Sequence, residues 1–179
     1  MSAQVATFGI RLLRCCVGQL RRWRLCCYSV FLILVATSVL PSAARAGGDW
    51  VDYRQIGRFY VRAEFPLNRY AAISRFLDEI DEQESDIVAT LGLEQSDELI
   101  VINLLGDRRS FMEYVAQFAP DGIRRQALFL REGDRGTVFA YLNPQVVTDL
   151  RHEVTHAVLH SMLPFLPIWL DEGLAEYFE

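Results

Sequence analysis

Two histidines four residues apart flank a glutamate in the segment His152-Glu153-Val154-Thr155-His156. On an α-helix, residues with this spacing lie on one face, so both imidazoles can bind a single zinc ion. At about 3.6 residues per turn, Glu153 is turned by roughly 100° from His152 and lies beside the metal rather than on it. From there it can take a proton from a zinc-bound water, whose pKa is near ~7. The spacing therefore predicts a hydrolytic zinc site.

A catalytic zinc ion needs a third protein ligand and an open position for water. The candidate is Glu172, 16 residues after His156 on a further predicted helix that a proline-bounded turn allows to fold back. His160 also follows His156, but it would lie about 12 Å along the helix from His152 at 1.5 Å per residue. That is too far for both to ligate one ion with bonds of roughly 2.0–2.1 Å. We therefore expect His152, His156 and Glu172 as ligands and His160 as a surface or core histidine.

The two motifs together resemble the gluzincin metallopeptidases, the clan of thermolysin and aminopeptidase N, and within it the small "peptidase MA-like" bacterial domains. The resemblance covers Arg151–Glu179, where the first motif is followed by Trp-Leu-Asp-Glu-Gly-Leu-Ala at 169–175. It implies Zn²⁺ as cofactor, Glu172 as third ligand and Glu153 as general base. It also implies an α+β fold with a thermolysin-like zincin core. There an N-terminal mixed or antiparallel sheet with helices precedes the His-Glu-x-x-His helix and the helix of the glutamate ligand.

Two further roles follow from this resemblance. It implies a carboxylate at Glu176, four residues after Glu172, that accepts the N–H of a ligating histidine; Asp171 is a rival for that role. It also implies that an edge strand at 137–143 pairs with an extended peptide substrate, which would place Tyr141 beside the cleft. Each residue has an ordinary alternative, as a solvated helix acid or a plain strand residue.

Hydrophobic periodicity predicts the elements that must position these residues. The motif helix is expected to end before Pro164, and the glutamate helix to begin near Pro167. Asn68 is the expected N-cap of a long earlier helix, which Gly92 ends. The predicted order is a strand at 56–64, a helix at 67–91, a strand at 99–104, a helix at 110–118, a hairpin of strands at 127–131 and 137–143, a helix at 146–163 and a final helix from 167.

Residues 1–46 have the pattern of an export signal. Arginines without any acid precede an apolar run at 25–40, and Ala44-Arg45-Ala46 fits the small-x-small rule for cleavage. The apolar run of 16 residues is shorter than the ~20 that a membrane-spanning helix needs. We therefore expect cleavage before Gly47, a mature domain at 47–179, and a periplasmic or extracellular location. An N-terminal membrane anchor is the alternative.

Charge and cysteine usage narrow the function classes of the mature domain. All 18 basic residues are arginines and six precede Gly47, which leaves 12 arginines against 23 acids, a formal charge of −11. Such a surface repels nucleic acid and anionic membranes. All four cysteines lie in residues 1–46, so histidine and carboxylate must hold any metal. We expect a peptide or protein substrate, no nucleic acid, and no stable membrane contact after signal cleavage.

The sequence thus predicts an exported zinc metallopeptidase that hydrolyses peptide bonds through a zinc-activated water, with Glu153 as general base. In the resembled clan the residue that stabilises the oxyanion generally follows the glutamate ligand, whereas this chain stops at Glu179. We therefore expect a domain truncated at its C-terminus, in which Tyr141, Tyr177 or an arginine takes that role. The alternative is a catalytically inactive, zinc-stabilised binding module outside the cytoplasm; the third is a secreted α+β protein without metal.

Overall fold

The computed structural model describes residues 49–163 and 165–179, and the expected signal peptide lies outside this part of the chain. Within it, no helix combines the length and the apolar character needed to cross a membrane. The elements follow one another as β1 (Asp52–Ile56), β2 (Phe59–Ala63), the 3₁₀ helix η1 (Leu67–Arg69), α2 (Ala71–Asp78), α3 (Ile80–Leu91), β3 (Ile100–Leu105), α4 (Arg108–Val115), the 3₁₀ helix η2 (Pro120–Arg124), β4 (Ala127–Glu132), β5 (Arg135–Tyr141), α5 (Val146–Met162) and α6 (Ile168–Phe178).

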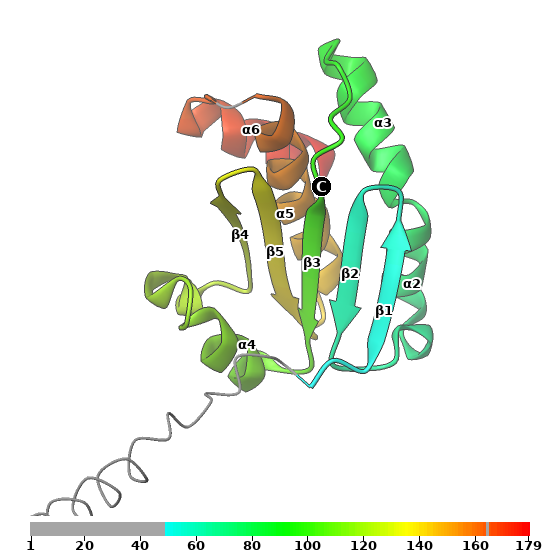
Figure 1. Cartoon of the computed structure of the whole chain (residues 1–179), viewed down its shortest axis with the longest axis vertical. Coiled ribbons are helices and arrows are strands. Elements are labelled where there is room, and N and C mark those ends of the chain that lie inside the picture. Colours follow the sequence, from blue (N-terminus) through cyan, green and yellow to red (C-terminus); the bar gives the residue numbers. More distant parts are fainter. Residues whose placement is uncertain (1–48, 164) are drawn as a thin grey trace, which may run out of the picture. The chain divides into compact units, whose positions relative to one another are not determined.

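Five strands form one mixed sheet in the order β1-β2-β3-β5-β4 (Figure 1). The central strands β2, β3 and β5 run parallel, whereas β1–β2 and β4–β5 are antiparallel hairpins. Parallel neighbours need long crossover connections, and here each crossover contains helix. The expected α+β class with a mixed sheet is therefore confirmed, and the sheet's two edges are β1 and β4.

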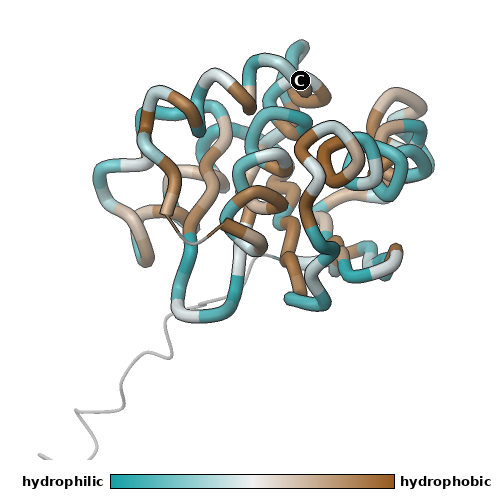
Figure 2. Tube along the Cα trace, turned by 90° about the horizontal axis from the view of Figure 1, so that it is seen from above, coloured by the Kyte–Doolittle hydropathy of each residue, from teal (hydrophilic) through white to brown (hydrophobic). Residues whose placement is uncertain are grey.

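The main core lies between the sheet and helices α2, α3 and α5, which cover one of its faces (Figure 1). In Figure 2 hydrophobic and hydrophilic residues alternate along the helical coils, as expected for helices with one buried side. On the other face, α4 packs on a second apolar cluster that includes Phe111, Phe139 and Tyr141. Every second residue of the central strands faces the main core: Phe59, Val61 and Ala63; Ile100, Ile102 and Leu104; Val138 and Ala140.

The long helix predicted at 67–91 is wrong as a single element. The structure has a 3₁₀ turn and two helices that part at Glu79, and Tyr70 rather than Asn68 occupies the N-cap position of α2. The Glu79 N–H donates to the carbonyls of both Arg75 and Phe76, which tightens the last turn of α2. Both halves bury apolar residues in the same core, so the hydrophobic spacing runs on across the break: Ile73, Phe76 and Leu77 in α2, and Ile80 and Ile87 in α3.

The strand predicted at 56–64 corresponds mainly to β2, which is the second strand of a hairpin with β1. Gly57 and Arg58 form a two-residue turn between β1 and β2, and Gly57 has the positive φ of 50° that such turns require. The pairing Ile56↔Phe59 closes the hairpin directly beside the turn. The prediction missed it because a two-residue turn interrupts the apolar pattern too briefly to separate two strands.

Gly92 ends α3 in the left-handed conformation, with φ 65° and ψ 35°, and an added Cβ would meet no atom within 4 Å. We expect Gly92→Ala to lower the free energy of unfolding by about 1 kcal/mol, because only the backbone conformation opposes the methyl group. Gly173 is the matched control: it also has open space around an added Cβ, but it lies inside α6. Gly173→Ala should raise the free energy of unfolding by about 0.5–1 kcal/mol. Urea unfolding of both variants measures this; shifts of the same sign would contradict it.

Candidate metal centre

The motif helix α5 packs on strands β4 and β5, and α6 packs against α5. Leu163 ends α5 in an extended conformation, as expected for a residue that precedes a proline. Pro167 stands at the N-cap position of α6 with φ −60°, and α6 begins at the next residue. In the sequence, Pro164 and Pro167 therefore stand between the two helices that carry the motif residues.

His152, His156 and Glu172 meet where α6 crosses α5. The two histidine Nε2 atoms are 3.2 Å apart, and Glu172 Oε2 lies 3.6 Å from His152 Nε2 and 3.8 Å from His156 Nε2. Four ligands placed tetrahedrally around zinc at 2.0–2.1 Å are separated by about 3.3 Å. The three atoms thus have the spacing and the chemical types of a zinc ligand set, so this group could hold a metal ion.

Carboxylates on the far side of each imidazole orient the two histidines. Asp171 Oδ1 lies 2.8 Å from His156 Nδ1, and Glu179 Oε2 lies 3.1 Å from His152 Nδ1. A carboxylate accepts hydrogen bonds, which assigns the proton of each neutral ring to Nδ1 and leaves a lone pair on Nε2. Two lone pairs and the Glu172 carboxylate then converge on one point. A cation bound between them relieves that repulsion.

The prediction that Glu176 supports a ligating histidine is wrong in this structure. Glu176 is exposed and makes no hydrogen bond to a histidine among the residues described. Its rival Asp171 contacts His156, and Glu179, which the sequence reasoning did not consider, contacts His152. A signal for Glu179 was present: it lies seven residues, about two helical turns, after Glu172 and so on the same helix face.

His160 is not part of the group of His152, His156 and Glu172, but it forms a second group with His156 and Asp171 whose ligand atoms lie within 4.8 Å of one another. Its Nε2 is 3.0 Å from Asp171 Oδ2, so Asp171 joins His156 to His160 through its two oxygens. Burial raises the pKa of Asp171, but the hydrogen bonds from His160 and His156 outweigh it, and the pKa lies below its ordinary value. Phe129 packs against both rings, with centroids 5.4 Å from His160 and 6.5 Å from His156. Asp171 therefore stays ionised and holds the His156 ring in place.

Glu153 faces a cleft of about 420 Å³ beside the ligand group. It is 7% exposed, and this burial raises the pKa of its carboxyl, while His156, His152, the Phe129 backbone N–H and Arg125 act in the opposite direction. A carboxylate with a raised pKa next to a metal-ligand set is a suitable general base. The cleft is lined by Arg124, Arg125, Gln126, Ala127, Gln145, Asp149, His152, Glu153 and Glu179.

The expected place of Tyr141 beside this cleft is wrong. Its strand β5 is not an edge strand, because it lies between β3 and β4. Tyr141 is 9% exposed and packs in the second cluster, with its ring centroid 5.3 Å from that of Phe111. Strand residues alternate between the two faces, so Tyr141 points away from the α5 side on which the motif lies. The edge strand beside α5 is β4.

Comparison with known proteins adds no assignment to this site. No protein-family model matches the chain, and no curated protein matches it. The geometry of the described residues and the sequence resemblance are therefore what bear on its function.

Proposed function

We propose that this protein is an exported zinc metallopeptidase with a thermolysin-like core. The observation that carries the proposal is the meeting of His152 Nε2, His156 Nε2 and Glu172 Oε2 within 3.8 Å, with Glu153 buried beside them. No thiolate competes for the metal in residues 47–179. Two imidazoles and one carboxylate are a donor set of catalytic zinc sites, which leave a fourth position open.

Zinc bound there would act as a Lewis acid, lowering the pKa of a water molecule and polarising a carbonyl. Glu153 acts as general base: it accepts the proton of the attacking water and passes it to the leaving amine. Its burial favours the protonated form and raises its pKa above the ordinary value, which suits a group that must take up and release one proton. Asp171 and Glu179 accept the Nδ1–H of His156 and His152, which turns the Nε2 atoms of both rings toward the metal position.

A peptide substrate would bind along β4. This strand pairs with β5 on one side only and packs against α5, and the backbone N–H of Phe129 in β4 lies close enough to the Glu153 carboxyl to favour its ionised form. The free backbone groups of an edge strand can pair with an extended peptide. Arg125 lines the cleft and lies near enough to favour the ionised form of Glu153, so it is the candidate donor to the oxyanion.

A catalytically inactive zinc-binding module is the second candidate. It is favoured by the composition of the cleft, whose described lining contains no tyrosine and no histidine besides His152. Tyr177, the other candidate donor, is 72% exposed on α6. One experiment on the purified full-length chain distinguishes the peptidase from the inactive module. It measures zinc content and cleavage of a peptide library. Stoichiometric zinc with cleavage supports the peptidase, and zinc without cleavage supports the module. Zinc far below one per chain would refute both.

We expect Asp171→Ala to weaken zinc binding by about 10- to 100-fold, because His156 loses the carboxylate that orients its ring. Competition with a zinc chelator of known affinity measures the change. Glu176→Ala is the matched control, since Glu176 is an exposed acid of the same helix. It should leave the affinity within about threefold, the size expected for an exposed charge near a metal. Equal effects of the two substitutions would contradict the role of Asp171.

A further inference from the structure

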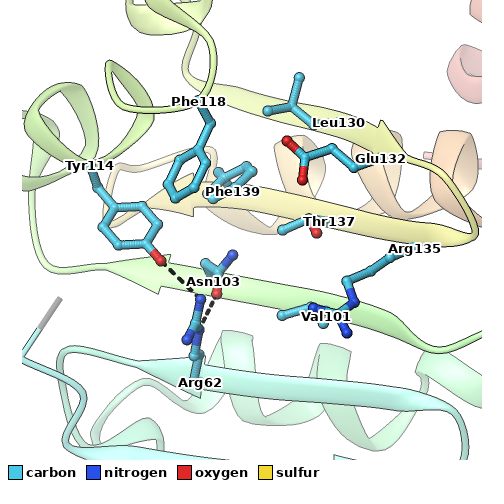
Figure 3. Close-up of a pocket in the computed structure, with 10 residues that line it drawn as sticks. All are labelled: Arg62, Val101, Asn103, Tyr114, Phe118, Leu130, Glu132, Arg135, Thr137 and Phe139. Carbon is cyan, nitrogen blue, oxygen red and sulfur yellow. Dashed lines mark hydrogen bonds between the residues drawn. The ribbon is translucent and has the colours of Figure 1, made fainter. Parts of the chain in front are cut away.

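A second hollow, of about 150 Å³, lies on the sheet face opposite the metal centre (Figure 3). It is built on outward-facing positions of β2, β3 and β5, whose neighbours along each strand face the main core. Arg62, Asn103 and Phe139 stand side by side across these strands, because Arg62↔Asn103 and Asn103↔Phe139 are register partners. Tyr114 of α4 and Phe118 close one end.

Arg62 brings a positive charge to this hollow without a carboxylate to balance it. Its Nε donates to Asn103 Oδ1, a second nitrogen donates to Tyr114 Oη at 2.9 Å, and its guanidinium lies 4.5 Å from the centre of a Trp50 ring. All three partners are neutral, and no described acid forms an ion pair with Arg62. A half-buried guanidinium held by neutral groups keeps its capacity to bind an anion.

Asn103 adds an unused hydrogen-bond donor. Its side chain is 0% exposed, and because its oxygen accepts from Arg62, its amide nitrogen has no partner among the described residues. Figure 3 shows this nitrogen turned into the hollow, away from Arg62. Buried polar groups in native proteins nearly always have a partner, so an unpaired donor that lines a hollow points to an acceptor supplied by a ligand.

The remaining wall sets the size and character of that ligand. Phe118 stacks on Phe139 with ring centroids 6.0 Å apart, and Phe118 is 47% exposed at the mouth. A cavity of about 150 Å³ is large enough for one benzene ring. The opposite end contains Glu132 and Arg135, which are register partners of β4 and β5, and Arg135 lies four residues before Phe139, about 13 Å along the strand. The two charges at that end are of opposite sign, whereas Arg62 has no acid beside it, so an anion is favoured at the Arg62 end.

We propose that this hollow binds a small carboxylic acid that carries a single aromatic ring. The carboxylate accepts hydrogen bonds from Arg62 and from the Asn103 amide nitrogen, and the ring packs against Phe118 and Phe139. The Asn103 nitrogen is buried in this structure, so the side chains around it have to shift for the carboxylate to reach it. The site is separate from the proposed zinc centre, because it lies on the other face of the sheet.

Calorimetric titration of the full-length chain with benzoate tests the proposal. We expect saturable binding of one benzoate per chain, at least tenfold tighter than binding of benzyl alcohol, which has the ring without the charge. Arg62→Gln should weaken benzoate binding at least tenfold, because it removes the cation. The matched control is Arg54→Gln, the same change on the neighbouring strand β1 at a position that does not line the hollow. It should leave the affinity unchanged.

Phe118→Ala provides a second variant that does not threaten the core, since this ring is half exposed in the wild type. It should also weaken benzoate binding, and circular dichroism verifies that every variant is folded. The proposal is overturned if benzoate does not bind saturably up to about 10 mM, where a dissociation constant corresponds to only about −2.7 kcal/mol. It is equally overturned if benzyl alcohol binds as tightly, or if Phe118→Ala leaves benzoate affinity unchanged.

Discussion

Glu153→Gln should reduce the rate of peptide hydrolysis by about 10²- to 10⁴-fold while zinc stays bound, because the variant keeps the shape of the side chain and loses the base. Glu153 supplies none of the three ligand atoms, which come from His152, His156 and Glu172, so its replacement leaves the ligand set intact. The measurement is kcat/KM for a cleaved peptide together with zinc content. Glu176→Gln, an exposed acid on α6, is the control and should retain full activity.

Glu153→Gln should not lower the free energy of unfolding. Burial raises the pKa of Glu153, so the folded protein holds this proton more tightly than the unfolded chain does. The stability contributed by the protonated form is then present at acidic pH and is lost as the pH rises through the folded-state pKa. Above that pKa a neutral glutamine therefore opposes folding no more than the ionised glutamate does. Activity within threefold of the wild type, or loss of zinc in a folded variant, would refute the role of Glu153.

His156→Ala should abolish stoichiometric zinc binding. His156 Nε2 is 3.2 Å from His152 Nε2 and 3.8 Å from Glu172 Oε2, so the alanine variant keeps only two of the three ligand atoms. Two protein ligands do not hold a catalytic zinc ion. In the wild type, a chelator should lower the melting temperature by roughly 10 °C, since zinc at about 1,000 times its dissociation constant stabilises by about 4 kcal/mol.

The His156→Ala variant should show no chelator effect on its melting temperature, because it holds no zinc to remove. His160→Ala is the matched control, a histidine one turn further along α5 that lies outside the ligand triangle. It should bind one zinc per chain and keep the chelator effect. A full zinc complement in His156→Ala, or its loss in His160→Ala alone, would show that the ligand set is a different one.

Local regularity explains which parts of the fold could be predicted. The hairpin of β4 and β5, the strand β3 and the limits of α5 and α6 depend on turn residues, alternation and prolines within a few positions of each element. The missed break at Glu79 and the missed turn at Gly57 are places where the hydrophobic pattern continues although the chain bends. Periodicity records which residues are buried, and it does not record whether one element or two bury them.

The order of strands is a property of the tertiary structure. The hairpin pairing of β4 with β5 is local, whereas the insertion of β5 beside β3 joins segments separated by the whole of α4 and η2. That insertion makes β4 the edge strand and places Tyr141 on the far face of the sheet. It also brings Asn103 between Arg62 and Phe139, which creates the second hollow. No spacing along the chain encodes these neighbours.

For the candidate site, the sequence by itself determined the pair His152 and His156, because four-residue spacing on a helix places side chains on one face whatever surrounds it. It also singled out Glu172, which the structure brings to both histidines. Only the tertiary structure decided which acids support them. Glu176 and Glu179 follow Glu172 by four and seven residues, but the packing of α6 on α5 brings Glu179 to His152 and leaves Glu176 exposed. Helix periodicity defines a face, and packing between helices decides which part of that face meets a partner.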